Sequence, residues 1–435
     1  MNRIWAITIG ALLMAFSFLA YFNVYFMDFS FQAGFVRTSF IVLLSFMIVL
    51  ILRYFLLIYF SSLNFLLPHP KRELTEFPLV SILLPAFNEG VGIENAIKSA
   101  LGQNYPNIEV IVIDDGSSDN TIAQASRYSG FHGNGKLTII TQPNQGKATA
   151  LNNGIAASHG QFILCMDGDS LLDPNVLKEI IPRFDNPKIG AVAGNVKVAN
   201  RHKTLTKLQA LEYIEGLNMV KRAQSFFQTV NIIPGPLGVF RRTAIVGVGG
   251  YDHDTFAEDC DLTIKLLRAG WKVEYEPDAI SWTEAPEKVI PLLTQRYRWT
   301  RGILQSLKKH SAMLFKNSVW DRTSLVLWYM LFEALFWPAI NIFTQFFFVY
   351  VACTTEMVRM VIFWWLQLTL LDMMAALLCV TLEGESLVFV PYAILYRFYF
   401  VVLIDVCKFF ATLEELFHVK MIWGQLERKG ARRSG

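Results

Sequence analysis

The hydrophobic positions of this chain form two kinds of pattern, long uninterrupted runs toward its two ends and short runs separated by polar turns between them. The long runs cover residues 4–27, 39–60, 325–351, 361–380 and 387–410. Each is about as long as, or longer than, the roughly 20 residues with which an α-helix crosses the hydrocarbon of a bilayer. The pattern therefore predicts membrane helices on both sides of a hydrophilic middle.

The first long run is interpreted as a retained helix rather than a signal peptide. It is longer than the ~7–15 residues of a signal peptide's apolar region, and no small-residue cleavage site follows it before the second run. Basic residues follow the second run, at Lys71 and Arg72, and recur in the last residues of the chain. Because loops rich in lysine and arginine stay on the cytoplasmic side, the middle and the tail are both expected there.

The run at 387–410 carries Arg397 and Asp405. A cytoplasmic carboxyl end requires an even number of crossings, so this run is expected either to lie in the membrane interface or to break into two pieces around Arg397. Charged residues also occur in the other runs, at Arg53, Glu333 and Asp372. Because charge is costly in lipid, these side chains are expected to face a channel, to reach toward the interface or to pair between helices.

Between about residues 79 and 285 the pattern changes to short apolar runs followed by amphipathic stretches. Continuous apolar runs such as LVSILLPAF (79–87) and IEVIVIDDG (108–116) are typical of strands buried on both faces. The stretches between them have helical periodicity. The alternation predicts a doubly wound α/β domain, in which ligands bind beyond the carboxyl ends of the strands.

These patterns divide the chain into five parts. We expect two N-terminal transmembrane helices, a cytosolic α/β domain, amphipathic interfacial helices, C-terminal transmembrane helices and a basic cytosolic tail. The corresponding residues are 1–62, 63–286, 287–320, 321–412 and 413–435.

The composition agrees with this division. Hydrophobic residues make up 53% of the 435 residues and charged residues only 17%, below the ~25% of typical soluble domains. The formal net charge is only +3, so charge gives no indication of a nucleic-acid partner.

Acidic residues stand directly after the apolar runs, where a sheet would present them to a ligand. Asp167 and Asp169 flank Gly168, which permits a tight turn. Two carboxylates at the end of a buried strand repel each other unless a cation neutralises them, and Mg²⁺ or Mn²⁺ holding a diphosphate would do so. The alternative is that both aspartates cap the following turn.

A second acidic group opens a predicted helix in FAEDCDLTIKLLRAGW (256–271). Its Glu258, Asp259 and Asp261 would stabilise the positive end of the helix dipole. A carboxylate beside a metal-diphosphate centre would equally serve as a general base. The residues of this stretch alone leave both alternatives open.

Seven short motifs follow one another along the chain: PAFNE (85–89), DDGSSD (114–119), NQGKATALNNG (144–154), DGDS (167–170), GPLGVFRR (235–242), AED (257–259) and QRYRW (295–299). Together these motifs occur in an order that resembles the membrane-embedded family 2 glycosyltransferases of the processive kind, such as cellulose, chitin, hyaluronan and poly-N-acetylglucosamine synthases. Among these the chain is most similar to the bacterial poly-β-1,6-N-acetylglucosamine synthases. The resemblance implies a cytosolic GT-A domain, which is doubly wound and Rossmann-like, flanked by transmembrane helices.

The resemblance, matched residue by residue, implies a site for a UDP-sugar. Asp115 would bind the uridine, and Asp259 would be the catalytic base. Asp167 and Asp169 would meet the metal and the diphosphate. The family has Thr where this chain has Ala257, so one hydroxyl beside the base is missing. The other residues implied in nucleotide-sugar binding are Pro85, Asn88, Glu89, Lys147 and Arg298.

The GPLG and QRYRW motifs would form the acceptor site. Gly235, Pro236 and Leu237 would line it, because glycine allows the polymer end to approach closely. Gln295 would lie beside it, and Trp299 would stack under the acceptor sugar at a channel mouth. The plainer interpretation of QRYRW is an interfacial helix with arginine in the headgroups and tryptophan in the aromatic belt.

The implied reaction is an inverting, processive transfer of a sugar, by preference N-acetylglucosamine, from a UDP-sugar to a growing β-linked polysaccharide, with Mg²⁺ or Mn²⁺ as cofactor. The polymer would be exported through the inner membrane, and a small membrane protein would be a further partner. Two alternatives stay open: transfer of one sugar to a lipid, and synthesis of another β-glycan such as hyaluronan, chitin or cellulose. A transporter or structural membrane protein would leave the ordered acidic motifs unexplained.

Overall fold

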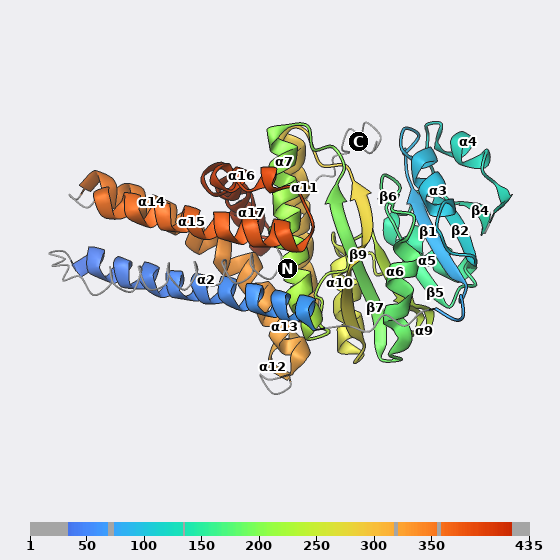
Figure 1. Cartoon of the computed structure of the whole chain (residues 1–435), viewed down its shortest axis with the longest axis horizontal. Helices are drawn as coiled ribbons and strands as arrows, with labels where there is room; N and C mark the ends of the chain where they lie inside the picture. Colours follow the sequence, from blue (N-terminus) through green and yellow to red (C-terminus); the bar gives the residue numbers. More distant parts are fainter. Residues whose placement is uncertain (1–33, 68–73, 134, 317–320, 355–357, 420–435) are drawn as a thin grey trace.

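The computed structural model describes most of the chain between residues 34 and 419. The described ranges are 34–67, 74–133, 135–316, 321–354 and 358–419. The first predicted membrane run and most of the basic tail lie outside them. The molecule is elongated, with long helices at one end and an open β-sheet at the other (Figure 1).

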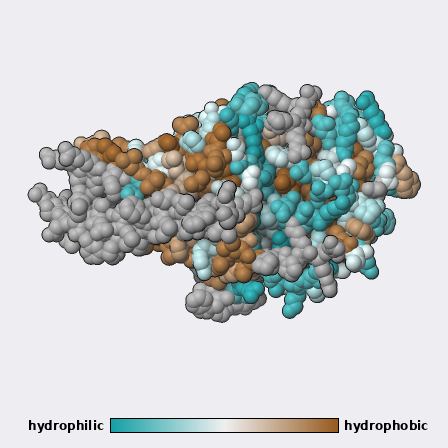
Figure 2. Space-filling model, viewed as in Figure 1, coloured by the Kyte–Doolittle hydropathy of each residue, from teal (hydrophilic) through white to brown (hydrophobic). Residues whose placement is uncertain are grey.

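Three long helices extend from the end opposite the sheet, α2 (Gly34–Leu66), α14 (Trp337–Thr354) and α15 (Val358–Leu382). Hydrophobic side chains gather over this end and hydrophilic ones over the sheet (Figure 2). In the described part of the chain, four segments are long and apolar enough to cross a membrane. They are Ile48–Leu66, Arg322–Thr354, Trp364–Leu382 and Leu387–Leu416.

The last of these segments does not break at Arg397. A π-helical turn at Tyr396–Val401 joins α16 (Tyr392–Leu395) to α17 (Val402–Leu416), so the helix is continuous. Figure 1 shows α17 nearly end-on, whereas α2, α14 and α15 run across the view. The break around Arg397 is therefore not observed, and the interfacial position of this helix stays a prediction.

Charged side chains of the apolar runs pair between helices. Arg53 of α2 donates from Nε to Glu333 at 2.5 Å, and Arg397 holds both carboxylate oxygens of Asp372 of α15. Asp405 of α17 accepts a hydrogen bond from an asparagine of α14 at 2.8 Å. Of the three expected outcomes for charges in these runs, pairing between helices is the one that the structure follows.

Amphipathic helices stand between the apolar helices and the sheet. α7 (Thr204–Glu212) continues through a π-helical turn (Tyr213–Asn218) into α8 (Met219–Phe226), which packs along α2. α11 (Val289–Lys309) lies beside α7 and packs against α17 (Figure 1). This layer connects the two ends of the molecule.

The sheet has nine strands in the order β3-β4-β2-β1-β5-β8-β7-β9-β6. In its first half β4, β2, β1 and β5 are parallel. The chain leaves β1 toward β2 and later returns to its other side with β5, so a switch point lies between β1 and β5, where open α/β sheets bind ligands. The strands of this half are β1 (Val80–Ala86), β2 (Ile108–Asp114), β3 (Gly130–His132), β4 (Gly135–Thr141) and β5 (Phe162–Cys165).

The second half of the sheet is mixed. β8 (Gly238–Arg241) is antiparallel to β5 and to β7 (Ile189–Val198), and β7 is parallel to β9 (Lys272–Thr283). β6 (Leu171–Leu172) closes the edge against β9. The predicted α/β fold is confirmed, and its sheet is mixed rather than parallel throughout. A continuous apolar strand shows only that both of its faces are covered, and it does not fix the direction of its neighbour.

Helices cover both faces of the sheet and create two cores. Ile82 and Leu84 point to the face covered by α3 (Ile93–Leu101) and α6 (Val176–Ile180), because strand residues alternate. Leu83 points to the other face, which α5 and α10 cover. The remaining helices and turns are α4 (Thr121–Ser126), α5 (Lys147–Ala157), α9 (Arg242–Gly247), α10 (Glu258–Arg268), α12 (Ala312–Lys316), α13 (Arg322–Leu331), and the segments Ile181–Asp185, Phe332–Phe336 and Leu387–Phe389.

Candidate active site

One edge of the sheet collects the residues that follow its central strands. β1, β2 and β5 are parallel, so their carboxyl ends bring Asn88, Asp115 and Asp167 to the same edge. β8 runs the other way and begins there, where Gly238 pairs with Cys165. The GPLG segment therefore enters the same edge as the acidic motifs.

Lys147 stands at the centre of the charged groups. It is the first residue of α5, and its Nζ lies 2.6 Å from Asp167 Oδ1 and 3.1 Å from Glu258 Oε1. A Cβ added to Gly235 would lie 2.9 Å from the same Nζ and 3.0 Å from Asp167 Oδ2. Because glycine has no Cβ, the backbone of GPLG can lie directly against this ion pair.

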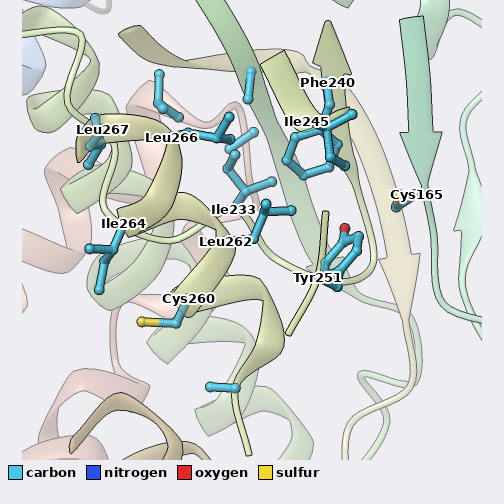
Figure 3. Close-up of a cluster of buried hydrophobic side chains, with 14 of the residues drawn as sticks. Cys165, Ile233, Phe240, Ile245, Tyr251, Cys260, Leu262, Ile264, Leu266 and Leu267 are labelled. Carbon is cyan, nitrogen blue, oxygen red and sulfur yellow. The ribbon is translucent and has the colours of Figure 1, made fainter. Parts of the chain in front are cut away.

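The first turn of α10 carries Glu258 and Asp259. Figure 3 shows Leu262 and Leu266 on the side of α10 that faces the sheet strands, and Ile264 on the opposite side. All three are buried, so α10 is fixed by packing on both sides. The two carboxylates at its start are therefore held in a defined position beside Lys147.

α11 approaches the start of α10 very closely. A Cβ added to Gly302 would lie 2.6 Å from both the Cβ and the backbone nitrogen of Ala257. A threonine at 257, as in the family pattern, would bring further atoms next to this contact. The departure at Ala257 is therefore accompanied by tight packing of the QRYRW helix on the helix that carries Asp259.

The pKa values of this centre reflect its surplus of acidic groups. Burial, followed by the charge of Asp167, raises the pKa of Asp169 to about 7. Burial, followed by the charge of Glu258, raises the pKa of Asp259 to about 6. Burial also acts to raise the pKa of Glu258, but Lys147, a backbone hydrogen bond and Arg298 together outweigh it, and the pKa is lowered. Of the two neighbours on α10, Asp259 is therefore the better proton acceptor.

Asp167 and Asp169 suit a hard divalent cation. Their carboxylates are the oxygen ligands that Mg²⁺ and Mn²⁺ prefer. Burial, followed by the charge of Asp167, disfavours the ionised form of Asp169, and a dication held by the two carboxylates would favour it. The residues present thus fit the metal that the sequence predicted.

Two of the predicted nucleotide-binding residues brace loops. Asp115 accepts hydrogen bonds from the backbone nitrogens of Gln145 and Gly146, at 2.9 and 2.8 Å, and so fixes the loop that leads into α5. Asn88 has a positive φ of 56° and accepts from the backbone nitrogen of Ser118 at 2.9 Å. Both line the sheet edge, and their contact with a nucleotide stays a prediction.

Pro85 and Glu89 lie at the end of β1 and are buried. A Cβ added to Gly168 would lie 3.0 Å from the Pro85 carbonyl oxygen and 3.2 Å from Glu89 Cγ. These two residues therefore support the turn of DGDS. Their predicted contact with the nucleotide-sugar is likewise open.

The GPLG residues divide between site and core. Gly235 faces the Lys147 ion pair, and the carbonyl oxygen of Pro236 accepts from Ser281 Oγ at 3.0 Å. Leu237 is fully buried in the sheet core, so its side chain does not line an acceptor site as predicted. The reason is that Leu237 immediately precedes β8, where apolar side chains are taken into the core.

Within QRYRW, Arg296 points toward α7. It is buried, and it binds Glu212 through two nitrogens. Gln295 accepts a hydrogen bond from the same guanidinium, which lies 4.2 Å from the ring centroid of Trp299. Trp299 is half-buried and packs against the apolar cluster formed with the long helices. The predicted acceptor residue is therefore part of the joint between the two ends of the molecule.

The other arginine of the motif points elsewhere. Arg298 lies close enough to Glu258 for its charge to help lower the pKa of that carboxylate. Tyr297 donates its hydroxyl to Glu414 of α17. Arg298 is thus the motif arginine whose charge acts on Glu258, and its contact with the diphosphate stays a prediction.

Three residues near the centre were not singled out from the sequence: Glu212, Tyr213 and Glu284. Burial raises the pKa of Tyr213 to about 12, and the charges of Asp167 and Asp169 contribute, so its phenol lies near them. Glu284 follows β9 and helps raise the pKa of Asp169. Its position after a strand, the signal that identified the other acidic residues, would have indicated Glu284. No local pattern marks Glu212 or Tyr213, which lie within a helix.

Comparison with known proteins agrees with this geometry. Residues 81–248 match the family described as Glycosyl transferase family 2. The chain is 36% identical over 234 residues to the poly-beta-1,6-N-acetyl-D-glucosamine synthase of Staphylococcus aureus (strain COL), over 54% of this chain and 56% of the relative. The synthase of the same name from Staphylococcus epidermidis is also 36% identical over 234 residues, 53% of this chain and 56% of the relative. The chain thus spans about half the length of these curated relatives.

A solved structure shows the same fold. The mannosyltransferase PcManGT from Pyrobaculum calidifontis, in complex with GDP-Man and Mn²⁺, has a TM-score of 0.62 and 21% identity and covers 86% of this chain and 98% of its own. At that identity the likeness concerns the fold alone. Residues 81–248, which contain Lys147 and the DGDS motif, therefore match the glycosyl transferase family 2 model, within a chain that shares the fold of this mannosyltransferase.

Proposed function

We propose that this chain is an inverting, processive glycosyltransferase. It transfers a sugar, by preference N-acetylglucosamine, from a UDP-sugar to the growing end of a β-linked polysaccharide. The observation that carries the proposal is the ionic centre in which Lys147 joins Asp167 of DGDS to Glu258, directly beside Asp259. It unites a candidate diphosphate site with a candidate base.

Asp259 acts as the general base. It removes the proton of the acceptor hydroxyl, whose oxygen forms a bond to the anomeric carbon of the donor. The bond from that carbon to the diphosphate breaks, and UDP leaves with the electron pair. A pKa of about 6 keeps Asp259 mostly ionised at neutral pH and still basic enough to accept the proton. A single displacement inverts the centre, so an α-linked donor gives a β-linked product.

Positive side chains stabilise the departing diphosphate. Lys147 and Arg298 supply this charge at the sheet edge and on α11. Asp167 and Asp169 would hold Mg²⁺ or Mn²⁺, which when bound neutralises charge on the leaving group. The Mn²⁺ and GDP-Man bound by PcManGT, a protein of the same fold, support this choice of ligands.

The helical end suits a product that leaves through the membrane. α11, which carries QRYRW, lies between the sheet and helices that are long enough to cross a bilayer (Figure 1). The relatives are named as synthases of a β-1,6-linked N-acetylglucosamine polymer. We infer a multi-pass protein of the inner membrane with its sheet in the cytoplasm, where UDP-sugars are found, and with a small membrane protein as partner.

The full chain in lipid nanodiscs, given single UDP-sugars with Mg²⁺ or Mn²⁺, tests the proposal. UDP release and long polymer from UDP-N-acetylglucosamine alone are expected. A single sugar attached to a lipid would contradict processive synthesis and favour a lipid glycosyltransferase. Polymer from UDP-glucose or UDP-glucuronate would change the assigned substrate, and no UDP release from any of them would overturn the proposal.

A further inference from the structure

The QRYRW motif is held in place by a residue outside it. Glu212, the last residue of α7, accepts from Arg296 Nε at 3.2 Å and from Arg296 Nη2. Gln295 Oε1 accepts from the third nitrogen, Nη1. All three nitrogens of the guanidinium therefore have partners, and its plane has one defined orientation.

This orientation depends on the carboxylate of Glu212. Arg296 is only 2% exposed, and a buried guanidinium is tolerated only where an anion and hydrogen bonds replace its water. Without the charge of Glu212, Arg296 would be drawn toward solvent. The position of Arg296 is therefore set by α7, although the residue belongs to α11.

Arg296 in turn fixes Trp299. The two residues are three apart on α11 and so share one side of the helix. The guanidinium carbon lies 4.2 Å from the ring centroid, which is the geometry of a cation–π contact. Trp299 also packs against the apolar cluster of the long helices, so the indole is held from more than one side.

We propose that Glu212 is a positioning residue of the acceptor site: through Arg296 it fixes the indole on which the last sugar of the polymer stacks. The inference rests on the proposed function and on the role that the sequence resemblance gives Trp299, which is to stack under the acceptor sugar. A π-helical turn begins directly after Glu212. The next residue, Tyr213, lies near Asp167 and Asp169. This part of the helix therefore lies near both the Arg296–Trp299 contact and the two aspartates of DGDS.

Glu212→Gln tests the inference, because it keeps the size of the side chain and removes its charge. The full chain in nanodiscs is assayed with UDP-N-acetylglucosamine and a short β-linked N-acetylglucosamine oligomer as acceptor. We expect the acceptor KM to rise about tenfold or more and the polymer to shorten, because a displaced platform misplaces the acceptor. UDP affinity should change less than about twofold.

Glu414→Gln is the matched control. Glu414 is the partner of Tyr297, so it holds the same motif from α17 instead of α7. The same substitution there should leave the acceptor KM unchanged. An equal rise in both variants would mean that any loosening of α11 has this effect, and it would overturn the specific role of Glu212.

A double-mutant cycle separates positioning from a general structural effect. Trp299→Leu removes the platform, so adding Glu212→Gln to it should raise the acceptor KM by less than about a further twofold. If the two substitutions raised the acceptor KM independently, so that their effects multiplied, the inference would be overturned. A loss of UDP affinity as large as the rise in acceptor KM would overturn it as well. If Glu212→Gln does not fold, Arg296→Lys replaces it, since lysine keeps the charge and loses the planar fork. Absence of UDP release by the unmodified chain would contradict the proposed function instead.

Discussion

At the helical end of the molecule two arginines each pair with one carboxylate, whereas at the sheet edge acidic side chains outnumber basic ones. Arg53 faces Glu333, and Arg397 faces Asp372, one carboxylate for each guanidinium. At the sheet edge Lys147 contacts two carboxylates, and two more lie close by. Balanced pairs hold helices together, while an unbalanced group is unfavourable until a ligand supplies the missing charge.

The sheet edge gathers more acidic than basic side chains. Asp167, Asp169, Glu258 and Asp259 come from two separate motifs, and the pKa values of Asp169 and Asp259 are both raised. Such an arrangement lowers the stability of the folded chain at neutral pH. It is therefore explained by binding and catalysis rather than by folding.

Glu215 lies between the two regions, in the π-helical turn that follows α7. It is buried, and its Oε1 has no hydrogen-bond partner among the residues that the structure describes. Burial, followed by the charge of Asp372, raises its pKa well above the usual value. Burial and the charge of Asp372 therefore disfavour the ionised form of the Glu215 carboxyl.

The largest expected effect tests whether the unbalanced edge is catalytic. Asp259→Asn should lower the rate of UDP release with acceptor by about 10²–10⁴-fold, because it removes the general base. UDP binding should persist, and the melting temperature should not fall, because surplus negative charge is removed. Asp254→Asn, at an exposed aspartate paired with Lys309, is the control and should leave the rate unchanged. A rate preserved in Asp259→Asn would contradict the assignment of the base.

The second-largest expected effect tests the pairs of arginine and carboxylate at the helical end. Asp372→Asn leaves Arg397 buried without its anion and should destabilise the chain by about 3–5 kcal/mol. Thermal unfolding in lipid measures it, and the double variant Asp372→Leu with Arg397→Met should recover most of the loss. Asp405→Asn keeps an acceptor oxygen and should cost less than about 1 kcal/mol. If Asp372→Asn is as stable as the unmodified chain, the pair does not hold the helices.

A smaller effect concerns the contact that joins the two regions. Gly302→Ala places a Cβ 2.6 Å from Ala257 and should cost about 1–3 kcal/mol, because α11 must move away from α10. Acceptor-dependent turnover should fall as well. Gly216→Ala is the matched control, since its Cβ would meet its nearest atom only at 3.9 Å. Equal losses of stability in both variants would show that steric contact is not the cause.

The smallest effect is a shift in pH dependence. As a base, Asp259 must be ionised, so kcat/KM should rise with pH through about 6 and then level off. Glu258→Gln removes the neighbouring charge that raises this pKa, so the midpoint should move to lower pH. The stability of the folded chain should change with pH in the opposite direction to kcat/KM. Because the folded pKa of Asp259 is raised, its contribution to stability is present at low pH and is lost as the pH rises through about 6.

The sequence identified most of the acidic centre because strand ends are local features. Asp167, Asp169 and Lys147 each follow a recognisable run or turn, and parallel strands necessarily bring such residues to one edge. Leu237 was wrongly assigned to the acceptor site, because a glycine-rich motif does not show which of its side chains enters the core. Glu212 was missed, because an acidic residue in an amphipathic helix has the same appearance whether it faces water or an arginine.

The apolar runs and the order of the motifs by themselves determined the elongated division into a helical end and an α/β domain, because hydrophobic periodicity fixes which surfaces are buried. Only the tertiary structure decided the roles of Arg296 and Arg298. The two side chains are chemically identical. A helix turns by about 100° per residue, so residues two positions apart lie on different sides of the helix. α7 meets one side and supplies Glu212, while α10 meets the other and supplies Glu258. These neighbouring helices determine that Arg296 contacts the Trp299 indole and that Arg298 lies near the acidic centre.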